Sequence, residues 1–229
     1  MNTLEKELTK LISTNKKSSY FKNQSPTVFH VSEAAKCSQK VVFDREKNKL
    51  QKQGETSIEP AFFTIGKAYE KYIHGKLPRY DAKAEFSFDK WTPVQIVYSQ
   101  GCGYTGSPDI VYREGQMKIP IEIKTTGSSD LEWYASGEKV KIQGSAYALA
   151  LFSNHWYLLV ASKNNKSQRF FKMNTKDKVY KEYTIEEFLR SKFVDLTGDL
   201  SLYSPMWTWE CQNRSSKCEY REKCPFFKP

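Results

Sequence analysis

Two strand-like segments separated by one short turn restrict the fold of this chain more than any other feature. Residues 107–113 and 117–125 are rich in strand-forming side chains, and the turn-forming sequence at 113–116 joins them. Strands joined by so short a turn pair with each other in a sheet. Further strand-like runs at 84–91 and 94–99 precede this hairpin, so we expect all four segments to form an antiparallel meander.

Helical patterns flank the predicted strands. We expect a short helix within residues 1–25, longer helices at 32–43 (carrying Cys37), 62–77, 137–152 and 184–192, and two more strands at 155–162 and 168–173. This order predicts a mixed α/β fold of the α+β kind, with a central mixed sheet flanked by helices. We divide the chain into an N-terminal helix and connector (1–29), a core (30–203) and a cysteine-rich tail (204–229).

The charge of the chain indicates the class of its partners. Its 229 residues include 36 Lys and Arg against 26 Asp and Glu, a net charge of +10. Such an excess favours nucleic acid over other partners. No run approaches the roughly 20 apolar residues of a membrane helix, and the N-terminus lacks the apolar middle of a signal peptide. We therefore expect a cytoplasmic protein without a membrane partner.

The hairpin also carries the residues with the clearest chemical pattern. Glu122 and Lys124 are two apart on one strand, so they share a face of the sheet. Asp109 begins the partner strand and can approach Glu122 through the hairpin. Two carboxylates can hold a hard divalent cation such as magnesium, and a nearby lysine can assist an attacking water or stabilise charge on a phosphate. The alternative is a solvated charged face, the usual state of a lone Glu-x-Lys pattern.

Two further patterns favour the chemical interpretation. Gly66 and Glu70 lie four apart on the helix that precedes the strands. Gln143 and Tyr147 lie one turn apart on the helix that follows, so both face the same side.

At these residues the chain resembles the PD-(D/E)XK nuclease superfamily, specifically its RecB-like and lambda-exonuclease-like branch. The match runs in order from about residue 30 to the end of the chain. The resemblance implies a restriction-endonuclease-like core in which Asp109, Glu122 and the main-chain carbonyl of Ile123 hold Mg or Mn. It also implies that Lys124 is the catalytic lysine.

The resemblance extends to the flanking helices. Gln143 and Tyr147 match the motif that positions substrate and the active-site lysine or phosphate. Glu70 matches a further metal ligand, which is His in many RecB-like members and Glu in relatives of lambda exonuclease. His74 lies one turn beyond Glu70, and we expect a surface or core histidine there rather than an accessory ligand.

The cysteines suggest a second metal centre. Cys211, Cys218 and Cys224 lie in the last 19 residues. Three thiolates cannot complete a four-thiolate site, and Cys37 is the natural fourth ligand. We expect Cys102 to be a buried strand residue rather than a ligand.

This arrangement is similar to the iron-sulfur nucleases of the superfamily, including the CRISPR adaptation nucleases and the AddB subunit. In those proteins one upstream cysteine and three near the C-terminus hold a [4Fe-4S] cluster. The resemblance therefore implies a cluster clamp at Cys37, Cys211, Cys218 and Cys224. Six residues separate Cys211 from Cys218 where these relatives often have two, so zinc is the alternative.

Together these features predict a Mg- or Mn-dependent deoxyribonuclease of recombination, repair or CRISPR adaptation. We expect an exonuclease that acts on single-stranded DNA or duplex ends. We also expect a protein partner in a recombination or CRISPR complex. The alternative is a non-catalytic DNA-binding or complex-assembly module that keeps the nuclease fold.

Overall fold

The computed structural model describes residues 27–51, 66, 68–69, 85–87, 94–99, 102–165, 167–198 and 218–225. Its strands are β1 (Val28–His30), β2 (Glu85–Ser87), β3 (Val94–Ser99), β4 (Cys102–Gly106), β5 (Ile110–Glu114), β6 (Met117–Thr126), β7 (His155–Ser162) and β8 (Gln168–Asn174). Its helices are α2 (Val31–Ala34), α3 (Ser38–Gln51), α5 (Leu131–Ala135), α6 (Glu138–Ala150) and α7 (Ile185–Thr197), and a short 3-10 helix, η3, spans Arg221–Lys223. None of the helices in the described ranges is long and apolar enough to cross a membrane.

The larger sheet contains the predicted hairpin. Its five strands lie in the order β2-β5-β6-β7-β8. β5 and β6 pair with Glu114 opposite Met117, and Gly115 has a φ of +62° in the two-residue loop, where a tight hairpin turn favours glycine. β6 pairs parallel with β7, and the other neighbours pair antiparallel. The predicted mixed α/β fold, a central mixed sheet flanked by helices, is confirmed.

A second, three-stranded sheet corrects the predicted meander. β3 pairs with β4 and not with the hairpin, in a sheet of order β1-β4-β3. β4 was not predicted, because its sequence Cys102-Gly-Tyr-Thr-Gly106 contains two glycines and lacks an alternating pattern. β1 pairs parallel with β4 on the edge opposite β3. The antiparallel meander was therefore wrong for residues 94–99.

The predicted helix at 32–43 is two helices. α2 ends at Ala34, and α3 begins at Ser38 and extends to Gln51. Cys37 thus lies in the connector and not on a helix, and its carbonyl accepts the first α3 hydrogen bond, from the Val41 N–H. The buried Lys192 ammonium of α7 stabilises the break, because it donates to the Lys36 carbonyl (2.5 Å) and to Ser38 Oγ (2.7 Å).

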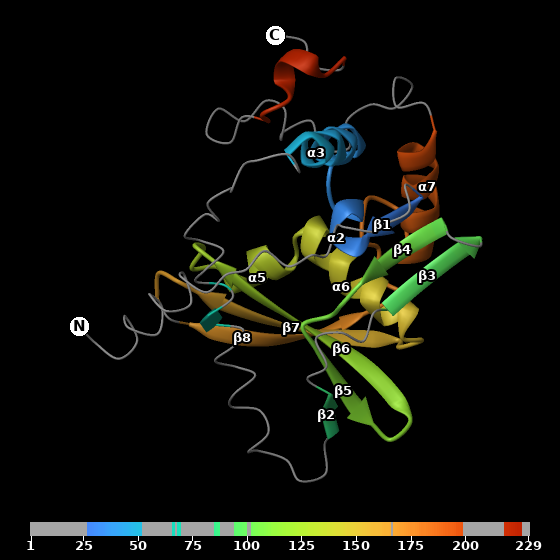
Figure 1. The fold of residues 1–229 in the computed structure, drawn as a ribbon. Helices are drawn as coiled ribbons and strands as arrows, with labels where there is room; N and C mark the ends of the chain where they lie inside the picture. Colours follow the sequence, from blue (N-terminus) through green and yellow to red (C-terminus); the bar gives the residue numbers. More distant parts are fainter. Residues whose placement is uncertain are drawn as a thin grey trace.

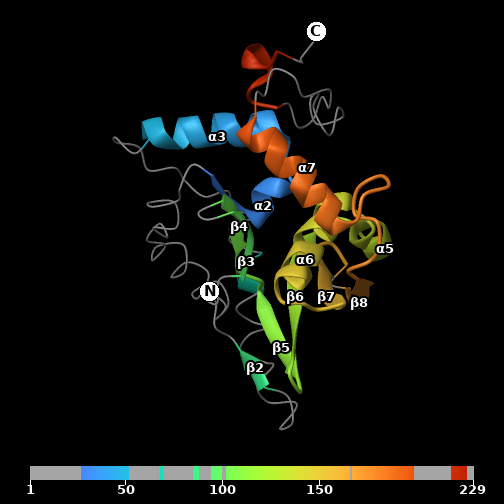
Figure 2. The same cartoon turned by 90° about the vertical axis from the view of Figure 1, so that its right-hand side faces the viewer.

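Helices cover one face of the larger sheet. α5 and α6 lie above it in Figure 1, and α6 packs on β6 and β7. Gly144 of α6 lies directly against the Trp156 ring, and Trp156 Nε1 donates to Ser145 Oγ at 3.1 Å. Figure 2 shows α7 running between α6 and α3, against both of which it packs.

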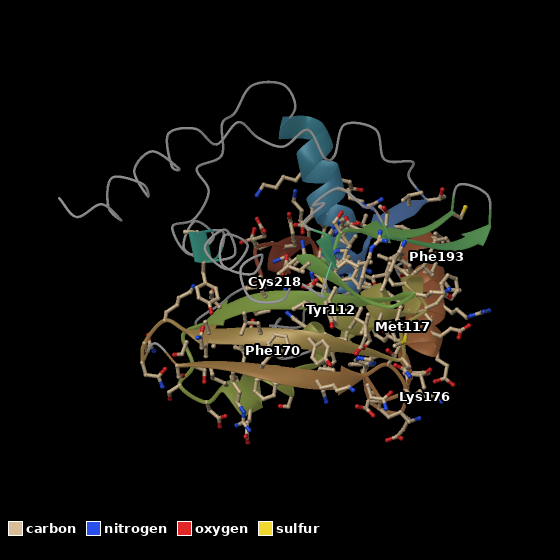
Figure 3. The ribbon with its side chains drawn as sticks, turned by 90° about the horizontal axis from the view of Figure 1, so that it is seen from below. Tyr112, Met117, Phe170, Lys176, Phe193 and Cys218 are labelled. Carbon is tan, nitrogen blue, oxygen red and sulfur yellow. The ribbon has the colours of Figure 1, made fainter. Side chains whose placement is uncertain are left out.

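The other face of the larger sheet carries aromatic side chains. Seen from below, Tyr112 and Phe170 lie on this face (Figure 3). Phe170 stacks on Tyr157 with ring centroids 5.1 Å apart, and Ile121 and Ile123 are buried on the same side. The two faces of β6 therefore have different surroundings, which decides where its charged side chains lie.

Several predicted elements fall outside the described residues. These are the N-terminal helix, most of the helix at 62–77 and the first part of the tail. Within 62–77, Gly66, Ala68 and Tyr69 are helical, as predicted.

Candidate active site

Asp109 lies where the two sheets meet. The connector Ser107-Pro108-Asp109 leads from β4 into β5, and Ile110 pairs with Ile121 across the hairpin. Asp109 therefore approaches the position of Glu122, and its Oδ2 accepts the Ile123 N–H at 2.7 Å. This hydrogen bond fixes the carboxylate against β6 and leaves its second oxygen for a ligand.

Glu122 is a buried carboxylate on the helix-covered face of the sheet. Its residue is 1% exposed, and its Oε2 accepts from Lys124 Nζ at 2.7 Å. Its Oε1 is buried and has no hydrogen-bond partner in the part of the chain that the structure describes. Burial raises the pKa of Glu122 to about 8, and the Asp109 carboxylate adds to this rise, while Lys124 opposes it. A solvated charged face is therefore the wrong interpretation of Glu122-x-Lys124.

Lys124 remains an ammonium in spite of its burial. Burial by itself lowers the pKa of Lys124, but the negative charges of Glu122 and Asp109 outweigh it and raise the pKa above its ordinary value. Tyr134 of α5 lies near enough for the lysine's charge to lower its pKa, although burial has the larger, raising effect. Sequence reasoning missed Tyr134, because a five-residue helix such as α5 gives no sustained periodic pattern.

Gln143 and Tyr147 support the loop that carries Asp109. Gln143 Nε2 donates to Tyr147 Oη at 3.4 Å on one side of α6. Tyr147 is 1% exposed and packs on Gly106, where an added Cβ would lie 2.8 Å from the ring. Gly106 directly precedes the connector Ser107-Pro108-Asp109. Tyr147, held by Gln143, therefore packs at the start of this connector.

The described part of the preceding helix lies on the opposite face of the sheet. Tyr69 packs with the cluster that contains Ile121 and Ile123, and its hydroxyl donates to Gln168 Oε1 at 2.8 Å. Glu70 and His74, the predicted further ligand and its neighbour, lie outside the described residues.

The arrangement suits a divalent cation. Asp109, Glu122 and the Ile123 carbonyl could supply the oxygen ligands that Mg and Mn prefer. Among the described residues Glu122 Oε1 has no donor, and leaving a buried acceptor unpaired is costly unless something binds it. Within the described ranges no three His, Cys, Asp or Glu side chains lie together as a ready metal site.

The cysteine tail docks on the helix that follows Cys37. Tyr220 donates from its hydroxyl to Asp44 Oδ1 at 2.8 Å and packs on Phe43, with ring centroids 5.1 Å apart. Cys37, Cys218 and Cys224 are free thiols, as is Cys102, which is half-buried on β4. Cys211, the remaining predicted ligand, lies outside the described residues.

Comparisons with known proteins bear on the fold. No family model and no curated protein matches the chain. Among solved structures, the chain is similar to the one described as the crystal structure of SSO0001, with a TM-score of 0.61 and 18% identity. The similarity covers 99% of this chain and 95% of that chain. At this identity it shows a shared mixed α/β fold over essentially the whole length.

Proposed function

We propose that the chain is a Mg- or Mn-dependent deoxyribonuclease of the PD-(D/E)XK type, acting on single-stranded DNA or duplex ends. The observation that carries this proposal is the buried Glu122 carboxylate. Lys124 binds Glu122 Oε2, Oε1 has no donor among the described residues, and Asp109 lies beside Glu122. Glu122 is fully buried and Asp109 is half-buried, and the single Lys124 ammonium offsets only one of their two negative charges, so the site is suited to a metal.

The chain's own residues account for the remaining steps of hydrolysis. A divalent cation at Asp109 and Glu122 would polarise the phosphate and lower the pKa of a water. Lys124 holds a fixed positive charge 2.7 Å from Glu122 Oε2, where it can donate to a phosphate oxygen as negative charge develops. The water oxygen bonds to phosphorus as the P–O bond to the departing sugar breaks, and the proton that the water loses passes through solvent to the departing sugar oxygen. Gln143 and Tyr147 keep the Asp109 connector in place.

Conservative substitutions test this proposal against matched controls on the same hairpin. We expect Lys124→Met and Glu122→Gln to reduce Mn-dependent cleavage of labelled single-stranded DNA at least about 100-fold, the usual effect of removing such a charge-stabilising group. The exposed neighbours Lys118 and Glu114 provide the controls Lys118→Met and Glu114→Gln, which should cleave like the wild type.

Binding and folding measurements separate the outcomes. Circular dichroism should show that the variants fold, and DNA affinity with Ca in place of Mn should persist. Wild-type activity in either site variant would contradict the assignment. A wild type that binds DNA but yields no products with Mg or Mn would instead favour a non-catalytic DNA-binding module.

We further propose that the cysteines hold a [4Fe-4S] cluster, with zinc as the alternative. Support comes from the docking of residues 218–220 on α3, which brings the tail to the helix directly after Cys37. Cys37, Cys218 and Cys224 are free thiols, but these three described cysteines do not lie together as a ready metal site. Iron, sulfide and zinc analysis of anaerobically purified protein distinguishes the two metals. Protein that contains neither iron nor zinc would contradict this part of the proposal.

A further inference from the structure

Trp133 is an exposed aromatic residue on a helix whose orientation is fixed. Leu131 and Ala135 of α5 are buried against the sheet, and Trp133, on the opposite side of this short helix, is 68% exposed. The main-chain N–H of Trp133 donates to Asp130 Oδ1 at 2.9 Å, and Asp130 thereby caps the helix. A tryptophan ordinarily buries about 150–250 Å² of surface, and Trp133 forgoes most of this contact in the isolated chain.

The position of α5 places this ring at the same edge of the sheet as the candidate active site. Lys124 lies near the carboxyl end of β6, and α5 begins shortly after that strand. Tyr134, adjacent to Trp133 on α5, lies near Lys124. The loop between β6 and α5 is anchored by the Lys163 main-chain N–H, which donates to the Thr126 carbonyl at 2.9 Å. Trp133 is therefore the immediate chain neighbour of a residue beside the candidate site.

The ring is surrounded by charges of both signs. Asp130 caps α5 with its carboxylate, and Glu132, the acidic neighbour of Trp133, forms an ion pair with Arg169 of β8. Lys163 adds a positive charge at the same edge, and the chain as a whole carries +10. Proteins that bind single strands combine positive charges with aromatic rings on which bases stack.

We propose that Trp133 is a stacking platform for a base of the single-stranded substrate, next to the Asp109–Glu122–Lys124 site. This inference rests on the proposed nuclease function and adds a substrate-binding residue to it. The ring supplies a flat surface for any base, so it contributes affinity without reading sequence.

The test measures affinity for a fluorescein-labelled oligo-dT by anisotropy, with Ca in place of Mn so that the strand stays intact. Stacking contributes about 1–3 kcal/mol per base, so Trp133→Ala should weaken binding about 5- to 150-fold. Trp133→Phe keeps a stacking ring and should retain most of the affinity. Phe152→Ala is the matched control, because Phe152 is 99% exposed but lies between α6 and the amino end of β7.

An abasic oligonucleotide of equal length separates stacking from indirect effects. It presents phosphates without bases, so the wild type and Trp133→Ala should bind it equally. Unchanged affinity of Trp133→Ala for oligo-dT, in a wild type that binds and cleaves DNA, would overturn this inference and leave the nuclease proposal standing. If Trp133→Ala weakened binding of oligo-dT and of the abasic oligonucleotide equally, that result would also overturn the inference. A wild type that neither binds nor cleaves DNA would overturn both.

Discussion

His30 is a single residue whose protonation state supports the start of α2. Its Nδ1 accepts the Ser32 N–H at 3.2 Å, while the His30 N–H donates to Glu33 Oε2 at 2.6 Å. Burial lowers the pKa of His30; the charge of Glu33 opposes this effect, and Lys36 adds to it. The neutral ring is therefore favoured in the folded state, because a protonated Nδ1 cannot accept from Ser32.

This environment predicts a dependence of stability on pH. The unfolded chain takes up a proton at His30 near pH 6.5, whereas the folded chain does so only at lower pH. The stabilising contribution is thus present above about pH 6.5 and is lost as the pH falls through the folded-state pKa. Urea midpoints measured between about pH 7.5 and 5 should fall more steeply for the wild type than for His30→Asn, which retains a capping acceptor. If the urea midpoints of the wild type and of His30→Asn fell equally with pH, that result would contradict the prediction.

The candidate site shows which residue-level features the sequence could predict. The spacing of Asp109, Glu122 and Lys124 predicts their proximity, because a hairpin brings near neighbours in the chain together. The burial of Glu122 could not be predicted in this way. It depends on the packing of α6 over β6, and these contacts are set by the whole sheet.

At the level of elements, the α6–β7 contact depends on one missing side chain. A Cβ on Gly144 would lie 2.2 Å from the Trp156 ring, which is itself fully buried. Overpacking of this kind usually costs about 1–3 kcal/mol and occasionally more. We expect Gly144→Ala to be destabilised by about 3 kcal/mol or more in thermal and urea unfolding.

Gly127→Ala provides the control for this prediction. An added Cβ there meets no atom within 4 Å, so we expect a change within about 0.5 kcal/mol. Equal stability of the two variants would show that α6 can shift away from β7 without loss.

Some helices and strands could be predicted from the sequence, and others could not. The predicted ranges of β7, β8, α6 and α7 agree with the structure to within five residues at each end. β4 is stabilised by β1 and β3, which pair with it on both sides. At the break before α3 the stabilising hydrogen bonds likewise come from Lys192, a residue more than a hundred positions away. Long-range partners of this kind leave no local signal.

At the scale of the whole molecule, the tail closes the chain back onto its beginning. The described part of the tail contacts α3 through few side chains. The Tyr220 hydrogen bond contributes about 1 kcal/mol, and the Tyr220 ring packs on Phe43. The Lys47–Glu219 ion pair is solvent-exposed and adds little. A metal shared between Cys37 and the tail would add to these contacts.

We expect loss of the metal and loss of the tail's protection from protease to occur together. Cys37→Ser and Cys218→Ser should each lower the bound iron or zinc and make the tail more susceptible to trypsin, which cleaves after its lysines and arginines. Cys102→Ser, on β4, should change neither quantity. Chelation of the wild-type protein should reproduce the protease sensitivity of Cys37→Ser. Full metal content in Cys37→Ser would remove that cysteine from the ligand set, and tail docking would then have to rest on Tyr220 and its neighbours.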